Sequence, residues 1–411
     1  MPDTIHATRP GTTRADCERL DREHPVARLR NRFSLPEKGI YLCGNSMGPV
    51  PRGVPERMRQ AVEVEWKEDV VRAWSSADWH VAPTRVGARL SHLIGAEEDE
   101  VIAVDSTSVN LFKLLVGALR LRPERRVIVA ERGDFPTDSY IAAEVAGMMG
   151  GELRLVGAHE LEAAIDDQVA VAAFSQVNYR TGYRHDMAAM TRRVHDAGAL
   201  MLWDLCHSAG VMPIELNACG ADLAVGCGYK YLNGGPGAPA YAFVARRHQA
   251  AFHPALWGWH GHAEPFEFHD DYTPHQGILR VRSGTSPQLS LIALEAALAA
   301  FDGVDLHALR DRSEQLSELM ISLHDEHLAP RGYALLSPRD AAQRGAHVAI
   351  TQALIAKGVI ADLRAPDVLR FGLAPMFVRC VDVFDTVSVL ADIVDQRLYE
   401  RPEYNVPGQV L

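Results

Sequence analysis

Short, almost purely apolar runs alternate with polar and amphipathic segments through the middle of the chain. The runs lie at residues 126–130, 169–174, 199–203, 221–228 and 240–245. Between two of them, residues 187–197 have helical spacing and end at Gly198, as a helix should. Continuous apolar strands separated by helices are typical of a parallel sheet that is buried on both faces. The pattern therefore predicts an α/β fold with a mainly parallel sheet.

The pattern changes after about residue 290. Residues 289–301 form an Ala- and Leu-rich helical stretch, residues 306–324 a charged one, and two short strand-like pieces follow at 358–363 and 368–373. This succession predicts a smaller α+β domain, which we expect the N-terminal residues to join in space. The predicted units are residues 1–55, a large domain at 56–295, and a small C-terminal domain at 296–411.

Composition and charge narrow the class of protein. A chain of 411 residues is long enough for two domains, and 47% apolar with 23% charged residues is ordinary for a soluble globular protein. A formal net charge of −11 argues against nucleic acid and anionic membranes as partners. It leaves a small anionic ligand possible, because local donors bind such a ligand.

The six cysteines are scattered without CxxC pairs, so we expect neither a disulfide framework nor a zinc site. The first residues lack the apolar region of a signal peptide, and no stretch approaches the length of a membrane span. We therefore expect a protein of the reducing cytoplasm.

Lys230 lies where the apolar run 221–228 meets the glycine-rich segment 231–237. A lysine among small residues is suited to a Schiff base with an aldehyde, which in this fold indicates pyridoxal phosphate. A surface lysine at a strand end is the simpler alternative. Asp204 and His207 follow another apolar run, and this chemistry needs an aspartate that keeps the pyridine nitrogen protonated.

Other segments offer contacts to a phosphate and to a ring. Thr107 and Ser108 precede the helical run 111–119, where hydroxyls either cap a helix or bind phosphate at its positive end. Phe135 follows a strand and is placed to stack on a pyridine ring or to plug a core edge. Ser175 is placed to contact the ring's 3-oxygen or to support Asp204.

His207 is open to three roles: positioning the aspartate, touching the phosphate, or a purely structural one. His260 and His262 are spaced i, i+2 without a carboxylate motif, so we expect no metal site. Residues 280–287 carry small hydroxyl residues before a helix, which again suits phosphate. Arg370 lies on a short apolar strand and either forms an ion pair at the domain junction or binds a carboxylate through two parallel hydrogen bonds.

These motifs together resemble the kynureninases, fold-type I pyridoxal phosphate enzymes of the aminotransferase superfamily. Asp-x-x-His followed by Tyr-Lys-Tyr-Leu-Asn-x-Gly separates that family from cysteine desulfurases and ordinary aminotransferases of the same fold. The segments that carry the resemblance are 41–48, 105–113, 135–138, 177–182, 203–210, 229–237, 258–262 and 369–375.

The resemblance implies a role for each candidate residue. Lys230 forms the Schiff base, Asp204 pairs with the pyridinium and Phe135 stacks on the ring. Arg370 binds the substrate carboxylate. A homodimer is implied, because some phosphate contacts come from the neighbouring subunit. The remaining residues expected around the cofactor are Thr107, Ser108, Asp138, Ser175, His207, Tyr229, Trp259 and Thr285.

The implied reaction is hydrolysis of L-kynurenine, or of its 3-hydroxy derivative, to anthranilate or 3-hydroxyanthranilate and L-alanine. Lys230 takes the Cα proton, and Tyr229 is placed to contact the phosphate and help to deliver a proton. Residues 66–80 do not align clearly, and asparagine replaces Thr285 in some relatives, so the substrate-ring contacts stay open. Whether the reaction serves tryptophan catabolism or NAD biosynthesis is equally open.

Two rival interpretations remain. Another fold-type I lyase or aminotransferase is one, such as a cysteine desulfurase, which needs a nucleophilic cysteine on a mobile loop. Cys380 is the only cysteine in the right half, and its apolar setting suits that role poorly. The other is a non-catalytic pyridoxal-phosphate-binding regulator, which no DNA-binding extension or basic patch supports.

Overall fold

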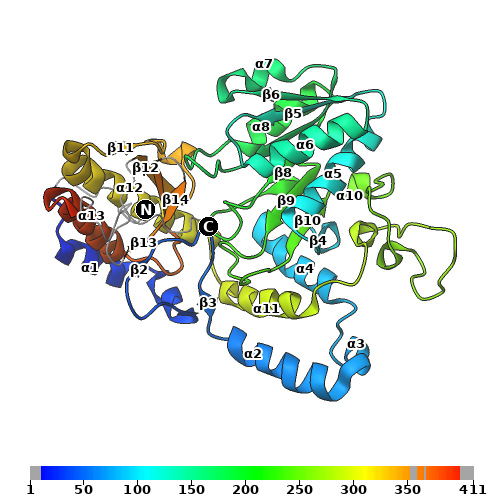
Figure 1. Cartoon of the computed structure of the whole chain (residues 1–411), viewed down its shortest axis with the longest axis horizontal. Coiled ribbons are helices and arrows are strands. Elements are labelled where there is room, and N and C mark those ends of the chain that lie inside the picture. The colour runs from blue at the N-terminus through cyan, green and yellow to red at the C-terminus, as the bar shows by residue number, and fades with distance from the viewer. Residues whose placement is uncertain (1–10, 352–358, 365–366, 399–411) are drawn as a thin grey trace.

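The computed structural model has a large α/β lobe and a smaller lobe that both ends of the chain help to build (Figure 1). It describes residues 11–351, 359–364 and 367–398. Residue 358 of the predicted strand at 358–363, and the outer residues of the predicted N- and C-terminal units, lie outside these ranges.

A seven-stranded sheet forms the centre of the large lobe within the described residues. Its strands in spatial order are β4 (Val101–Ala103), β10 (Ala240–Val244), β9 (Leu223–Cys227), β8 (Leu200–Asp204), β7 (Val169–Ser175), β5 (Val127–Glu131) and β6 (Glu152–Val156). All neighbours pair in parallel except β10, which is antiparallel to β4 and β9. The predicted α/β fold is confirmed.

The direction of β10 follows from the chain between it and β9. Residues 228–239 join the two strands without a helix, and a connection that short reverses the strand direction. This connection is the glycine-rich segment that carries Lys230. The lysine is therefore held at the carboxyl edge of the sheet.

Helices cover both faces of the sheet. Along β8 the side chains alternate, so Leu200 and Leu202 pack toward α5 (Thr107–Leu121) and α6 (Pro136–Met148). Met201 and Trp203 face the opposite core, which the following helices cover. These are α4 (Ala82–Ile94), α8 (Met187–Asp196) and α11 (Gln288–Leu298). Burial on both faces explains why the strands are apolar throughout.

Shorter helices complete the large lobe. They are α2 (Val54–Gln60), α3 (Ala73–Ser76), α7 (Leu161–Ala164), α9 (Leu216–Cys219) and α10 (Arg246–Gln249). Helix α2 continues into a π-helical segment, Ala61–Asp69, and the two project from the lobe beneath α11 (Figure 1).

The small lobe contains a second, antiparallel sheet. Its strands in order are β11 (Ala334–Leu335), β12 (His347–Thr351), β15 (Val368–Gly372) and β14 (Asp362–Arg364). Helices α12 (Leu306–Leu323) and α13 (Cys380–Asp395) pack beside it. Two short pairings tie in the N-terminal residues, β1 (Phe33–Ser34) with β3 (Val50–Pro51) and β2 (Ile40–Tyr41) with β13 (Val359–Ile360).

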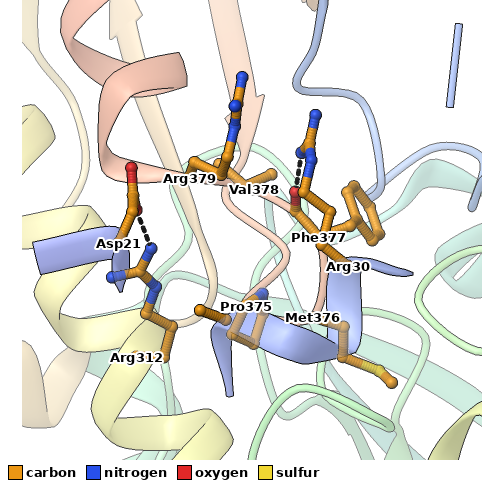
Figure 2. Close-up of a pocket in the computed structure, with 9 residues that line it drawn as sticks. Asp21, Arg30, Arg312, Pro375, Met376, Phe377, Val378 and Arg379 are labelled. Atoms are coloured by element: carbon orange, nitrogen blue, oxygen red, sulfur yellow. Dashed lines mark hydrogen bonds and ion pairs between the residues drawn. The ribbon is translucent and has the colours of Figure 1, made fainter. Parts of the chain in front are cut away.

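Asp21, on α1 (Arg14–Glu23), anchors the N-terminal helix to the small lobe (Figure 2). Its carboxylate accepts hydrogen bonds from the backbone N–H of Cys380, at 2.7 Å, and of Val381, at 3.1 Å. These two N–H groups lie in the first turn of α13, where they have no hydrogen-bond partner within the helix. Asp21 also pairs with Arg312 of α12, whose side chain is only 2% exposed. One carboxylate therefore joins three helices, beside a cavity of about 110 Å³.

We predict that Asp21→Ala lowers the free energy of unfolding by about 3–5 kcal/mol, because it leaves the buried Arg312 without its partner. Thermal and denaturant melts measure the loss. Asp385→Ala is the matched control, since it removes the exposed Arg14–Asp385 pair between the same two helices and should change stability far less. Equal losses in both variants would contradict this role of Asp21.

Candidate active site

Polar side chains gather where β5, β7, β8 and β9 end. Asp204 is the last residue of β8, and Ser175, the last of β7, lies opposite it in register. The backbone N–H of Cys206 donates to Asp204 Oδ1 at 2.6 Å, which fixes the carboxylate at the strand end. Lys230 follows β9, so parallel strands bring an aspartate and a lysine to one edge.

Three predicted residues surround Lys230. Its Nζ lies 3.0 Å from Nε2 of His207, 5.8 Å from the ring centroid of Phe135 and 5.9 Å from that of Tyr229. His207 therefore contacts the lysine rather than positioning the aspartate. Burial disfavours the ammonium, but nearby acidic groups outweigh burial and raise the pKa of Lys230; these are Cys227, Cys206, Tyr229 and Asp204.

Carboxylates crowd around Asp204. Asp138, on the first turn of α6, hydrogen-bonds to it, and burial and the charge of Asp204 raise the pKa of Asp138 well above its ordinary range. Burial and the charge of Glu131 raise the pKa of Asp134 to about 7, although the Ser175 backbone N–H donates to Asp134 at 2.9 Å. The cluster disfavours full ionisation and is suited to a cationic N–H group.

The start of α5 lies beside this cluster. Ser106 is the N-cap, and its hydroxyl accepts from the N–H of Val109 at 3.3 Å. The capping role is therefore taken by Ser106, and Thr107 and Ser108 form the first helical turn. Thr107 Oγ1 is 3.9 Å from Cys206 Sγ, two residues beyond Asp204. The first-turn N–H groups and hydroxyls of a 15-residue helix suit a phosphate here.

Arg370, on β15, is 1% exposed and faces the large lobe. Its Nη1 donates to the carbonyl of Tyr179 at 2.7 Å, and its Nη2 pairs with Asp362 and lies 3.2 Å from Ser46 Oγ. Burial lowers the pKa of Arg370, and the charge of Asp362 opposes that shift. Arg370 does form an ion pair, but with Asp362 of the neighbouring strand in its own sheet and not across the domain junction, and Nε has no partner among the described residues. Carboxylate binding stays a prediction.

The N-terminal segment 44–48 closes over the lysine loop. The N–H of Gly48 donates to the carbonyl of Tyr229 at 2.9 Å. A Cβ on Gly48 would lie 2.4 Å from the Lys230 carbonyl oxygen and 2.3 Å from Asn233 Oδ1. Only glycine fits this approach, so the segment's resemblance to the family motif has a steric cause.

Trp259 and Thr285 are exposed and have no contact with Lys230 among the interactions of the described residues. Trp259 is 40% exposed, and its ring lies 6.3 Å from that of Phe268 and 5.7 Å from that of Phe266. Thr285 lies in the connection before α11. The segment that contains Trp259 extends from the side of the large lobe opposite the small lobe (Figure 1).

Two residues of the site were missed by the sequence interpretation. His347 begins β12, is fully buried, and its ring lies 5.5 Å from that of His207. The Tyr179 ring packs edge-on to that of Phe135, with 5.3 Å between the ring centroids, and the guanidinium carbon of Arg370 lies 5.6 Å from the centroid of the Tyr179 ring. Tyr179 belongs to the motif 177–182, which gave a signal, whereas no pattern marks His347.

No group of metal-ligating side chains is found within the described ranges. Over the same residues, no helix is long and apolar enough to cross a membrane.

The arrangement fits pyridoxal phosphate. A half-buried amine matches the aldehyde, an aromatic ring beside it matches the pyridine face, and a helix start suits the phosphate. The clearest observation is the carboxylate pair Asp138 and Asp204, in which the raised pKa of Asp138 calls for a nearby positive charge. A protonated pyridine nitrogen supplies that charge.

Comparison with known proteins gives relatives at two levels. A family model described as the kynureninase C-terminal domain matches residues 309–390. A kynureninase of Burkholderia mallei (strain SAVP1) is 46% identical, over 95% of this chain and 98% of its own. A kynureninase of Pseudomonas fluorescens is 44% identical, over 97% and 100%.

Solved structures show the fold more distantly. The cysteine desulfurase CsdA of Escherichia coli has a TM-score of 0.72 at 18% identity, covering 90% of this chain and 98% of its own. A C-DES mutant with glycine covalently linked to its PLP cofactor has a TM-score of 0.75 at 17% identity, covering 88% and 99%. These likenesses confirm a fold-type I architecture.

We predict that the purified protein is yellow and that borohydride attaches the cofactor covalently to Lys230, because only a neutral amine beside a ring-binding site forms a reducible bond with an aldehyde. Peptide mapping locates the label. Lys230→Ala should bind the cofactor but lose turnover. A label on another lysine would contradict the assignment.

Proposed function

The chain belongs to the kynureninase family, and we propose that it hydrolyses L-kynurenine to anthranilate and L-alanine with pyridoxal phosphate bound around Lys230. The observation that carries the proposal is that the charges of Lys230 and Arg370 both act on His207, which contacts Lys230, while the charge of Asp204 acts on Lys230. Lys230, Asp204 and Arg370 match the aldehyde, the ring nitrogen and a substrate carboxylate.

Each residue has one task in this proposal. Bound pyridoxal phosphate supplies an electron-accepting ring that stabilises negative charge on the substrate carbons. Asp204 holds the proton on the ring nitrogen, and Asp138 supports that charge. Phe135 covers the ring face. The start of α5, with Thr107 and Ser108, binds the phosphate.

Lys230 moves the proton at the substrate Cα. Its amine would serve as the base, and the partner of that amine, Nε2 of His207, lies 3.0 Å away. Burial raises the pKa of Tyr229 to about 12, so its phenol keeps its proton at neutral pH. Tyr229 is thus suited to donate to the phosphate and to return a proton to the alanine carbon. Ser175, at the end of the neighbouring strand, supports Asp204.

The cysteine considered for the rival desulfurase activity does not suit the role of nucleophile. Cys380 is the first residue of α13, is fully buried, and burial raises the pKa of its thiol to about 12. A buried thiol of that pKa has almost no thiolate at neutral pH. Membership of the kynureninase family agrees with this chemistry.

The direct test is formation of anthranilate from L-kynurenine, followed by its fluorescence. Turnover with L-kynurenine and none with L-cysteine supports the proposal, and the reverse result overturns it. Running 3-hydroxy-L-kynurenine in parallel gives the ring preference.

We predict that Arg370→Lys lowers kcat/KM for L-kynurenine while leaving cofactor affinity unchanged, because a lysine gives one point charge where arginine gives a planar fork. Arg370→Ala should cost more, about 2–5 kcal/mol, since the substrate anion would lie unpaired in a dry site. Arg364→Lys is the control, because Arg364 pairs with the same Asp362 and is more exposed. A loss of cofactor binding without a change in substrate saturation would make Arg370 a structural residue.

We further propose a homodimer in which Trp259 and Thr285 complete the partner's site. Large apolar side chains are exposed on the same segment, with Trp257 at 56%, Phe266 at 62% and Phe268 at 74%. Trp74, from the helix that precedes α4, lies 6.4 Å from His260, so this surface is continuous with the projecting α2–α3 region. Exposed apolar patches of this kind mark interfaces.

Subunit complementation tests this arrangement. Lys230→Ala and Trp259→Ala subunits should be nearly inactive alone. After mixing and exchange they should recover about a quarter of wild-type activity, since each mixed dimer holds one native site. No recovery despite mixed-dimer formation would show that Trp259 serves its own subunit.

We also propose a cytoplasmic role in tryptophan catabolism or NAD biosynthesis. The support is chemical: Cys206 and Cys227 are free thiols beside Lys230, which suits a reducing compartment.

A further inference from the structure

Six unpartnered polar atoms lie in the buried layer between the lobes. They are Nδ2 and Oδ1 of Asn45, Nδ1 of His207, Nδ1 and Nε2 of His347, and Nε of Arg370. All four side chains are at most 7% exposed. A buried polar atom without a partner costs about 1–3 kcal/mol, so this layer is built to hold hydrogen-bonding groups or water.

The fold brings His347 to this layer from the small sheet. His347 pairs with Gly372 in register, and Ala349 pairs with Arg370, so His347 and Arg370 project from the same face of the sheet. The next residue, Val348, points to the opposite face. His207 approaches from the large lobe, and its ring lies 5.5 Å from that of His347.

The contact with Lys230 fixes the protonation of His207. The Lys230 ammonium has donors only, so Nε2 of His207, at 3.0 Å, must accept. A neutral imidazole that accepts at Nε2 carries its proton on Nδ1. That N–H needs an acceptor, and it has none among the described residues.

His347 provides the missing acceptor. Burial and the charges of Arg370 and Lys230 lower the pKa of His347 to about 3, so its ring is neutral and has one acceptor nitrogen. The Tyr179 backbone carbonyl opposes that shift. The same carbonyl accepts from Arg370.

We propose that His347 is a positioning residue that, through one bound water, accepts the Nδ1 proton of His207 and so keeps the Nε2 lone pair of His207 directed at Lys230. Arg370 Nε, on the same face of the small sheet as His347, also has no partner among the described residues and is the third polar group that such a water could bind. The inference deepens the proposed function, because it concerns the base of that reaction.

The consequence for Lys230 has a definite direction. Without His347, the Nδ1 proton of His207 loses its acceptor and the Nε2-protonated tautomer is favoured, which sets a donor against the ammonium. The pKa of Lys230 then falls. Other charged or titratable groups act on this pair and stay in place; they are Asp204, Asp138, Cys206, Cys227 and Tyr229 around Lys230, and Arg364 and Arg370 around His207.

The test measures the amine directly. Full-length protein from which the cofactor has been removed captures added pyridoxal phosphate covalently, and only through the neutral amine of Lys230. The dependence of this capture rate on pH therefore reports the pKa of Lys230. His347→Leu should lower that pKa by about one unit. It should also reduce kcat/KM for L-kynurenine by about 10- to 100-fold, because removing a residue that positions a functional group has an effect of this size. His347→Gln, which retains an acceptor, should recover most of both.

Val348→Ala is the matched control, because it opens a cavity at the next buried position of the same strand. It should leave the capture pKa unchanged. In a His207→Gln background, His347→Leu should produce no further shift. A shift that persists in that background, or an equal shift in Val348→Ala, overturns the proposal.

A second measurement does not depend on how the variants fold. The ¹⁵N chemical shifts of His207 in the wild-type protein should show the proton on Nδ1, and a proton on Nε2 overturns the proposal. Failure of the proposed function can be distinguished from failure of the His347 proposal. If only the proposed function fails, wild-type protein releases no anthranilate, while the capture profiles still shift as described.

Discussion

Burial of opposite charges at one edge of a parallel sheet is the constraint on which this structure depends. Asp204 is buried and Asp138 beside it is half-buried, an arrangement that disfavours two negative charges, and Lys230 lies in the loop beside them. Apolar strands, covered on both faces, form the edge of the sheet that carries these groups. The site is therefore poised for a cationic ring nitrogen, because that charge relieves the repulsion that burial creates.

The small lobe completes the site from the opposite side. Its antiparallel sheet presents His347 and Arg370 to the large lobe, and the N-terminal segment closes over the lysine loop at Gly48. Asp21 links the N-terminal helix, which precedes the segment that covers the active site, to α12 and α13.

Local patterns predicted the strands, the position of Lys230 and the aspartate at the end of β8, because each depends on a short run of sequence. The antiparallel direction of β10 follows from the short connection between β9 and β10, which carries Lys230. Tertiary packing decided the rest. Ser106 rather than Thr107 caps α5, His207 contacts Lys230, and His347 reaches the site through strand pairing that no local pattern reveals. The roles of Trp259 and Thr285 stay predictions.

The central claim is that Asp204 keeps the ring nitrogen protonated, and Asp204→Asn tests it most directly. Comparing turnover of L-kynurenine by this variant and by wild-type protein, both saturated with pyridoxal phosphate, gives the answer. The account predicts an intact fold and a loss of at least about 100-fold, which corresponds to ~3 kcal/mol in the transition state. Near-normal turnover would mean that another group faces the ring nitrogen and would contradict the account.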